Sequence, residues 1–152
     1  MEPGGPDGPP VRRSHGQRHV RFDHTIVPST DKERSARWYA ELLDLGPVRT
    51  EPPFACVDLG NDVTLAFGGW DTAPVHAQHY AFHVEETRFD TVLARLVDRG
   101  IDYYADSSAT RVGEVNHDDG GRGLYFRDPD GNFLELITVR YGGRPLAYGD
   151  PG

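Results

Sequence analysis

The chain has 152 residues, of which 37% are hydrophobic and 26% are charged, and its formal net charge is -8. This length and composition predict a globular protein with one compact domain, or two small modules that share a core. The negative charge argues against a nucleic-acid partner and against anionic membrane surfaces, and no apolar run is long enough to span a bilayer.

The cysteine content and the two ends of the chain indicate its compartment. The single cysteine, Cys56, excludes an intrachain disulfide, and its strand-like surroundings predict a small core residue. Residues 1–19 are rich in Gly, Pro and Arg and contain no apolar segment, which predicts a disordered tail and no secretory signal. Residues 142–152 are again rich in Gly and Pro and are expected to be loosely ordered. We therefore expect a cytoplasmic protein with one ordered domain over residues 20–141.

The first half of this domain begins with a predicted strand over residues 21–27. A helix follows, because Thr30 and Glu33 form a capping-box pattern and apolar residues then recur at helical spacing up to a glycine. Two strands are predicted over residues 54–59 and 63–67, joined by Gly-Asn-Asp, which is typical of a hairpin turn.

The second half repeats this order of elements. Its predicted helix has Thr87 as the candidate N-cap and Gly100 as the stop signal. Five apolar residues form the stripe that this helix should bury: Phe89, Val92, Leu93, Leu96 and Val97. The predicted strands cover residues 79–84, 101–104, 122–126 and 133–141, and an Asp-Pro-Asp-Gly turn joins the last two.

The repeated order of elements predicts an α+β fold made of two modules, over about residues 20–70 and 78–141. Each half reads as β-α-β-β with a further weak strand, and the repeat is one of pattern and not of identical residues. One face of each sheet would be covered by its helix. The other faces would have to be buried against each other or around a ligand, which predicts a cleft between the two sheets.

Glu135 is an energetic anomaly in this pattern. It lies in the middle of the strongly apolar strand Phe133-Leu134-Glu135-Leu136-Ile137. A charge in such a strand costs several kcal/mol, in order-of-magnitude terms, unless it is paired or coordinates a metal. His24 and His79 lie on the strands that open the two modules, so each candidate ligand belongs to a strand.

Two imidazoles and one carboxylate can occupy one face of a divalent metal and leave positions open for substrate, water or dioxygen. His24, His79 and Glu135 would form this set, with Fe(II) as the first expectation and Mn, Zn, Ni or Co as other metals that use such ligands. Two alternatives stay open at this point. His83 faces the same way as His79 and could replace it, and the three residues could also form a hydrogen-bonded core group without metal.

Three segments resemble the vicinal oxygen chelate superfamily, which includes glyoxalase I, extradiol dioxygenases, fosfomycin-modifying enzymes and bleomycin-resistance proteins. They are residues 22–27 before the capped helix, residues 79–82, and the run from Tyr125 to Glu135 with its Asp-Pro-Asp-Gly turn. The resemblance implies the paired βαβββ fold of this group, with metal ligands at His24, His79 and Glu135. The fourth ligand of glyoxalase I has no counterpart in the apolar residues 63–67, which disfavours that activity.

Other candidate site residues come from the second module. Tyr125 matches a tyrosine that the dioxygenases and the fosfomycin enzymes place before the ligand glutamate, and it is expected to act as an acid or hydrogen-bond donor. His83 is a candidate base beside the metal. The polar, glycine-rich loop over residues 113–122 could cover the mouth of the cleft, which makes Asn116, His117 and Arg122 candidate substrate-binding residues. A solvated loop is the alternative.

The resemblance leads to a divalent-metal enzyme as the expected function, with extradiol-type cleavage of a small oxygen-rich or aromatic substrate as the first specific prediction. The alternatives are lyase, isomerase or thiol-transfer chemistry on the same fold, or a drug- or metabolite-binding protein of the bleomycin-resistance type without turnover. Members of this group often form homodimers, and some build each site from two chains. We therefore expect a homodimer with a small-molecule ligand.

Overall fold

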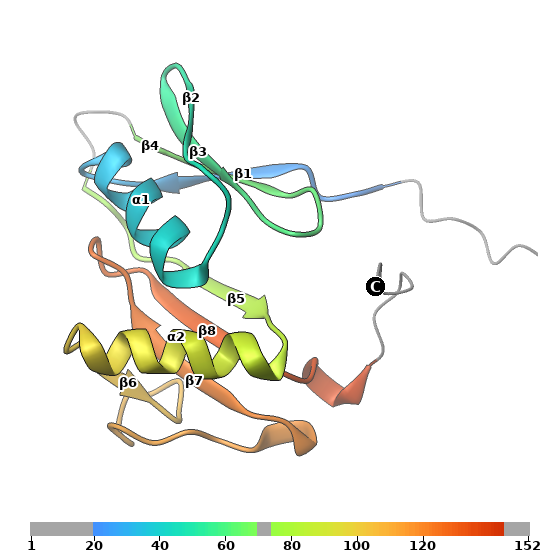
Figure 1. Cartoon of the computed structure of the whole chain (residues 1–152). Coiled ribbons are helices and arrows are strands. Elements are labelled where there is room, and N and C mark those ends of the chain that lie inside the picture. Colours follow the sequence, from blue (N-terminus) through green and yellow to red (C-terminus); the bar gives the residue numbers. More distant parts are fainter. Residues whose placement is uncertain (1–19, 70–73, 145–152) are drawn as a thin grey trace, which may run out of the picture.

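The computed structural model describes residues 20–69 and 74–144, so the predictions for residues 1–19 and for all but the start of 142–152 lie outside the described residues. The first module contains β1 (His24–Pro28), α1 (Lys32–Leu43), β2 (Arg49–Glu51), β3 (Phe54–Asp58) and β4 (Thr64–Gly68). The second contains β5 (His79–His83), α2 (Glu86–Asp98), β6 (Tyr103–Tyr104), β7 (Gly123–Arg127) and β8 (Phe133–Ile137), with short 3-10 helices η1 (Asp118–Gly120) and η2 (Tyr141–Gly143) (Figure 1).

Each module forms a mixed sheet of four strands, in the orders β1-β4-β3-β2 and β5-β8-β7-β6. The opening strand of each module pairs parallel with its last strand, and the other pairs are antiparallel. This confirms the predicted α+β fold of paired βαβββ modules. The short strands β2 and β6 are the additional weak strands, and His24 and His79 occupy the same first position of β1 and β5.

Helix α1 begins one residue later than the capping-box pattern predicts. Asp31 is the N-cap, and its side chain accepts a hydrogen bond of 3.0 Å from the backbone N–H of Arg34. The hydroxyl of Thr30 is used elsewhere, because it donates to Asp130 at 2.6 Å. The helix ends at Asp44, which adopts the left-handed conformation, and not at Gly46.

Helix α2 also differs from its predicted ends. Thr87 lies inside the helix and not at its cap, because the helix starts at Glu86 with Glu85 as an N-cap that makes no side-chain capping bond. Gly100, with φ of 63°, follows the C-terminus as predicted. Val97 was expected in the buried stripe but is 62% exposed, since the face buried by Phe89, Val92 and Leu96 excludes it.

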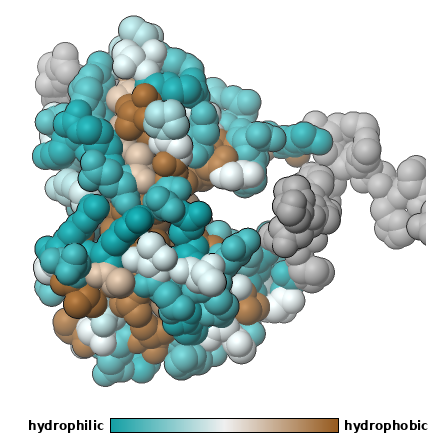
Figure 2. Space-filling view, viewed as in Figure 1, coloured by the Kyte–Doolittle hydropathy of each residue, from teal (hydrophilic) through white to brown (hydrophobic). Residues whose placement is uncertain are grey.

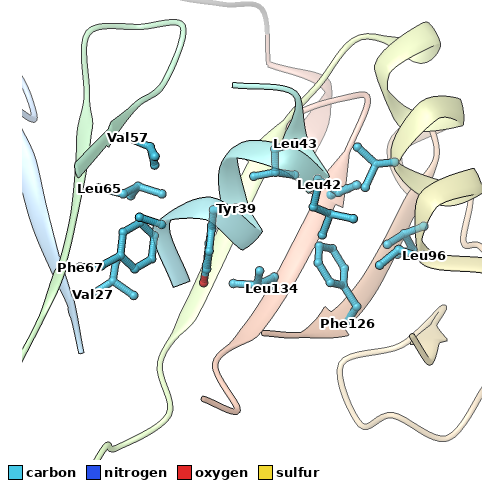
Figure 3. Close-up of a cluster of buried hydrophobic side chains, with 14 of the residues drawn as sticks. Val27, Tyr39, Leu42, Leu43, Val57, Leu65, Phe67, Leu96, Phe126 and Leu134 are labelled. Carbon is cyan, nitrogen blue, oxygen red and sulfur yellow. The ribbon is translucent and has the colours of Figure 1, made fainter. Parts of the chain in front are cut away.

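The helix-covered faces of the two sheets meet in one hydrophobic core. Tyr39 of α1 lies between them, with its ring centroid 4.8 Å from Phe67 of β4 and 6.5 Å from Phe82 of β5. Figure 3 shows this ring between first-module side chains such as Val27 and second-module side chains such as Leu134. The open faces of the sheets therefore do not face each other, and the expected cleft between them does not form within one copy of the chain.

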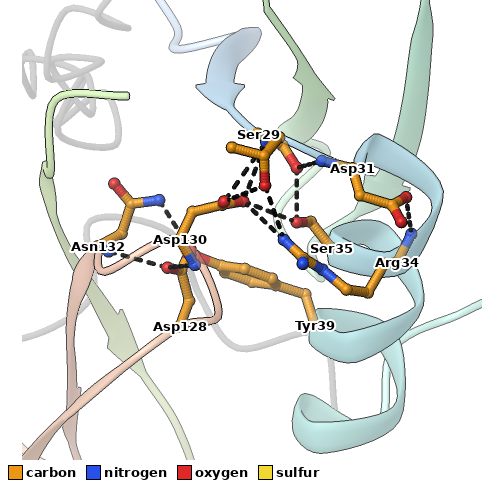
Figure 4. Close-up of polar contacts among 9 residues, drawn as sticks. Ser29, Asp31, Arg34, Ser35, Tyr39, Asp128, Asp130 and Asn132 are labelled. Atoms are coloured by element: carbon orange, nitrogen blue, oxygen red, sulfur yellow. Dashed lines mark hydrogen bonds and ion pairs between the residues drawn. The ribbon is translucent and has the colours of Figure 1, made fainter. Parts of the chain in front are cut away.

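The Asp-Pro-Asp-Gly turn connects the second module to helix α1 through a set of polar contacts, which we call the turn network (Figure 4). Its members are Ser29, Thr30, Arg34, Ser35, Tyr39, Asp128, Asp130 and Asn132. The carboxylate of Asp128 accepts from the Tyr39 hydroxyl at 2.7 Å and from the Asn132 side chain at 2.7 Å. The carboxylate of Asp130 accepts from Thr30 at 2.6 Å and from Arg34 at 3.2 Å.

The surface agrees with the acidic, polar composition. Figure 2 shows that hydrophilic residues cover most of the face in view. Within the described ranges, neither long helix has the length and apolar character that would be needed to cross a bilayer.

Candidate metal centre

Strand pairing brings His79 and Glu135 together on the open face of the second sheet. In the parallel β5–β8 pair, His79 lies opposite Phe133 and Ala81 opposite Glu135, so the two side chains share a face. The Nε2 atom of His79 is 3.1 Å from Oε2 of Glu135. Glu135 is only 1% exposed, whereas the His79 side chain is 48% exposed. The Glu135 carboxylate is therefore buried, and the His79 imidazole beside it is open to solvent.

Two tyrosines complete the surroundings of this carboxylate. The hydroxyl of Tyr141, on η2, lies 2.6 Å from Oε1 and 2.5 Å from Oε2 of Glu135. Tyr125 lies opposite Glu135 in the antiparallel β7–β8 pair, and its hydroxyl interacts with both Tyr141 and Glu135. We call His79, Tyr125, Glu135 and Tyr141 the Glu135 cluster.

The cluster keeps the tyrosine hydroxyls protonated. Burial raises the pKa of Tyr125 far above its ordinary value, and the hydrogen bonds with Tyr141 and Glu135 raise it further. Burial, followed by the hydrogen bond to Glu135, also raises the pKa of Tyr141. At neutral pH both phenols can therefore donate hydrogen bonds but cannot act as bases.

An aromatic surface borders the cluster. The rings of Tyr125 and Phe133 are stacked with centroids 5.4 Å apart, and the His79 ring lies 6.1 Å from Tyr125 and 6.2 Å from Phe133. The guanidinium of Arg127 lies over Phe133 at 4.7 Å. This surface can pack against a flat, apolar group of a ligand.

His24 lies on the open face of the other sheet, at the start of β1, and its side chain is 59% exposed. Its Nδ1 atom is 2.6 Å from the Asp23 carboxylate. Asp23 precedes β1 and can therefore lie beside His24, although neighbouring residues within a strand point to opposite faces. The pairing leaves Nε2 of His24 as the nitrogen available to a ligand.

The three predicted ligands do not meet within one copy of the chain. Among residues 20–69 and 74–144, no three His, Cys, Asp or Glu side chains lie close enough to hold a metal together. In the first sheet, the position that corresponds to Glu135 is Ala66, which pairs with Ile26 as Glu135 pairs with Ala81. The first module thus offers one imidazole, and the second offers an imidazole and a carboxylate.

The remaining predicted site residues have other partners. Nε2 of His83 contacts the backbone carbonyl of Thr138 at 3.2 Å. The buried amide of Asn116 donates to the carbonyl of Ala105 at 2.8 Å and accepts from the N–H of Asp118 at 3.2 Å. Arg122 binds Glu86 and Asp90 and packs over the Phe89 ring at 4.4 Å. His117 is exposed and directly precedes η1, which packs against η2.

Sequence reasoning missed Tyr141 because it was assigned to the end of a long strand over residues 133–141. Strand β8 ends at Ile137, and Gly142 and Gly143 adopt positive φ values of 70° and 63° within η2. The Tyr-Gly-Gly sequence was the available signal for a turn at this point. The chain leaves the sheet after Ile137, and the Tyr141 hydroxyl lies against Glu135.

Two solved structures resemble this chain closely. The structure named oxidase ChaP-H1 is 47% identical, with a TM-score of 0.79, and the match covers 82% of this chain and 99% of that chain. The structure named oxidase ChaP-H2 is 44% identical, with a TM-score of 0.78, and the match covers 83% of this chain and 99% of that chain.

A shorter likeness joins the chain to a protein named metallothiol transferase FosB, from Shouchella clausii (strain KSM-K16). The two are 40% identical over 60 residues, which is 40% of this chain and 37% of that relative, so the match spans little more than a third of the relative's length.

The family comparison covers both modules and both predicted ligand-bearing sheets. The model of the Glyoxalase/Bleomycin resistance protein/Dioxygenase superfamily matches residues 21–136, a range that ends one residue after Glu135. Proteins of this superfamily usually bind a divalent metal, act on small-molecule ligands and often form dimers. The chain belongs to the Glyoxalase/Bleomycin resistance protein/Dioxygenase superfamily.

Proposed function

We propose that this protein is a metal-dependent oxidase or dioxygenase that acts on a small, flat, oxygen-rich or aromatic substrate. The observation that carries the proposal is the buried Glu135 carboxylate beside the open imidazole of His79, at 3.1 Å. The two similar solved structures that are named oxidases support oxidation as the class of reaction. The stacked Tyr125 and Phe133 rings support a flat substrate.

The proposed metal site is shared between two copies of the chain. The open faces of both sheets lie outside the common core, and each carries part of the ligand set. Because His24 and His79 occupy equivalent positions in the two modules, the first sheet of one copy can face the second sheet of another. A symmetric dimer of this kind gives two sites, each with His24 from one copy and His79 and Glu135 from the other.

The donor set fits a divalent metal. Two imidazoles and one carboxylate suit Fe(II) first, and also Mn, Co, Ni or Zn. Asp23 would accept a hydrogen bond from Nδ1 of His24 and so leave Nε2 of His24 for the metal. Carboxylates often orient histidine ligands in this way. When bound, the metal would supply Lewis-acid chemistry and a centre for reaction with dioxygen.

Tyr125 would serve the reaction as a proton-bearing donor. Burial and its neighbours raise its pKa far above its ordinary value, so the phenol keeps its proton and can donate a hydrogen bond to a substrate oxygen. The rings of Phe133 and His79 would fix the plane of the substrate. These residues bind and orient, and their apolar surface excludes water from the reacting atoms.

A mixing experiment tests the shared site. We expect His24→Ala and Glu135→Ala each to lose metal binding alone. Co-expression of the two variants should restore about a quarter of the wild-type sites, because half of the randomly formed dimers are mixed and each mixed dimer has one intact site. A site formed within one chain would give no restoration.

Metal content and oxygen uptake test the enzyme proposal. The protein should bind Fe(II) stoichiometrically after anaerobic reconstitution and consume oxygen with some members of a catechol and polycyclic phenol panel. A protein that takes up less than about a tenth of an equivalent of any divalent metal would instead be a binding protein of the drug-sequestering type.

Thiol transfer is a second candidate function, favoured by the partial match to the metallothiol transferase. The same metal site would then act as a Lewis acid without using dioxygen. Metal-dependent loss of free thiol in the presence of an electrophile, with no oxygen uptake on the phenol panel, would favour this second function over the first.

A further inference from the structure

Tyr141 has a position that no prediction assigned. It follows Glu135 by six residues, yet its hydroxyl lies 2.6 Å and 2.5 Å from the two carboxylate oxygens. The residue is 51% exposed, so its ring is largely at the surface while its hydroxyl reaches a carboxylate that is 1% exposed.

The position of Tyr141 is fixed by a paired stretch of backbone beside it. The N–H of Thr138 donates to the carbonyl of Arg122 at 2.9 Å, and the N–H of Arg122 donates to the Thr138 hydroxyl at 2.9 Å. Gly121 lies so close to Val139 that an added Cβ would come within 2.7 Å of its side chain. The N–H of Gly143 closes the turn by donating to the carbonyl of Arg140 at 2.8 Å. The hydroxyl is therefore presented by an ordered turn.

The chemistry of the hydroxyl suits one task. A phenol has a single proton, so it can donate to one carboxylate oxygen at a time. The hydroxyl lies within reach of both oxygens, and a bond to either one fixes the orientation of the carboxylate, whose Oε2 faces His79. Hydrogen-bonded partners of this type orient ligand carboxylates and affect metal affinity.

We propose that Tyr141 is a positioning residue that holds the Glu135 carboxylate beside His79, in the orientation in which it would bind the metal. This inference rests on the proposed function, because it requires that Glu135 is a metal ligand. Tyr141 itself does not touch the metal or the substrate in this role. Removing its hydroxyl should weaken metal binding and change the ligand geometry, while the fold and the dimer persist.

The test compares Tyr141→Phe with Tyr104→Phe in the full-length protein. Tyr104 lies opposite Tyr125 in the β6–β7 pair, which makes it a matched tyrosine on the same sheet. Co(II) is the probe, with its affinity measured by chelator competition and its coordination by visible absorption. We expect Tyr141→Phe to weaken Co(II) binding about 10-fold and to change the absorption bands, and Tyr104→Phe to do neither. Circular dichroism and gel filtration should show that both variants stay folded with the oligomeric state of the wild type.

The outcomes separate this inference from the proposal beneath it. If the wild-type protein binds Co(II) and Tyr141→Phe binds it equally well with the same spectrum, the positioning role is overturned and the metal site stands. Equal weakening in both variants also overturns it. If the wild-type protein binds no Co(II), Fe(II) or Zn, the metal site fails and the role of Tyr141 fails with it. Should Tyr141→Phe not fold, Tyr141→Leu, which keeps an apolar side chain at this half-exposed position but has no hydrogen-bond donor, is measured in its place.

Discussion

The turn network and the Glu135 cluster place buried carboxylates only a few residues apart in the chain, yet they differ in how those charges are satisfied. Asp128 accepts hydrogen bonds from Tyr39, from the Asn132 side chain, and from the backbone N–H groups of Asp130 and Asn132. All four donors belong to residues of the turn network itself. Glu135 has one half-exposed imidazole and two phenols around it.

On this difference we propose a structural role for Asp128 and a functional role for Glu135. Backbone and amide donors fix Asp128 completely, so it joins the second module to helix α1 and has no capacity left for a ligand. The partners of Glu135 are a histidine that can bind a metal and hydroxyl groups that can reorient. A buried carboxylate is not a candidate ligand site on the ground of its burial alone. It becomes one when a residue that contacts it is also open to solvent, as His79 is.

The largest expected effect is the loss of stability when Asp128 is replaced by Ala. The substitution leaves the Tyr39 hydroxyl, the Asn132 amide and two backbone N–H groups without their acceptor inside the protein. We expect the free energy of unfolding to fall by about 4 kcal/mol, measured by urea denaturation. A loss below about 1 kcal/mol would mean that the turn network does not hold the modules together.

In contrast to Asp128→Ala, Glu135→Gln should weaken metal binding without lowering the stability of the metal-free protein. Gln has the same size but lacks the charge, so metal affinity should fall about 100-fold or more, as measured by Co(II) titration. The metal-free protein should unfold at the same urea concentration as the wild type or a higher one, because the substitution removes a buried charge. A strong destabilisation without metal would instead assign Glu135 to the structure.

Asp130→Asn tests the part of the turn network that binds Thr30 and Arg34, and its dependence on pH. Burial alone would raise the pKa of Asp130, but hydrogen bonds from Thr30 and Ser29 and the charge of Arg34 lower it below its ordinary value. A lowered pKa in the folded state contributes stability above the unfolded-state pKa, and that stability is lost as the pH falls through the folded-state pKa.

We therefore expect Asp130→Asn to cost about 2 kcal/mol of unfolding free energy at pH 7. The difference from the wild type should shrink as the pH falls below about 4, and urea denaturation at several pH values measures it. A difference that stays constant down to pH 2 or so would assign the effect to packing and not to the charge.

The fold was largely predictable from sequence because hydrophobic periodicity and turn residues act locally. The Asp-Pro-Asp-Gly turn, both helices and the repeated order of strands were assigned close to their observed positions. The error at the start of α1 arose because a competing contact took the expected capping residue. Thr30 is that residue, because its hydroxyl binds Asp130, which lies 100 residues away in the chain.

The candidate site was predictable only in part. The pairing of β5 with β8 brings His79 and Glu135 together, and the alternation of strand side chains was enough to propose that. The separation of His24 from them was not readable, because it depends on how the helix-covered faces pack into one core. The placement of Tyr141 depends on the end of β8 at Ile137, which hydrophobic periodicity does not show.

The smallest expected effect belongs to His83→Ala, and it decides which histidine of β5 belongs to the Glu135 cluster. Both histidines lie on the same face of the strand, but His83 pairs with Ile137 and contacts the carbonyl of Thr138, whereas His79 contacts Glu135. We expect His83→Ala to leave Co(II) affinity within about twofold of the wild type, and His79→Ala to weaken it at least 10-fold. Chelator competition measures both variants under the same conditions. If His79→Ala binds Co(II) normally and His83→Ala does not, the metal lies beside His83, at the other end of β5. Glu135 would then be a structural carboxylate like Asp128.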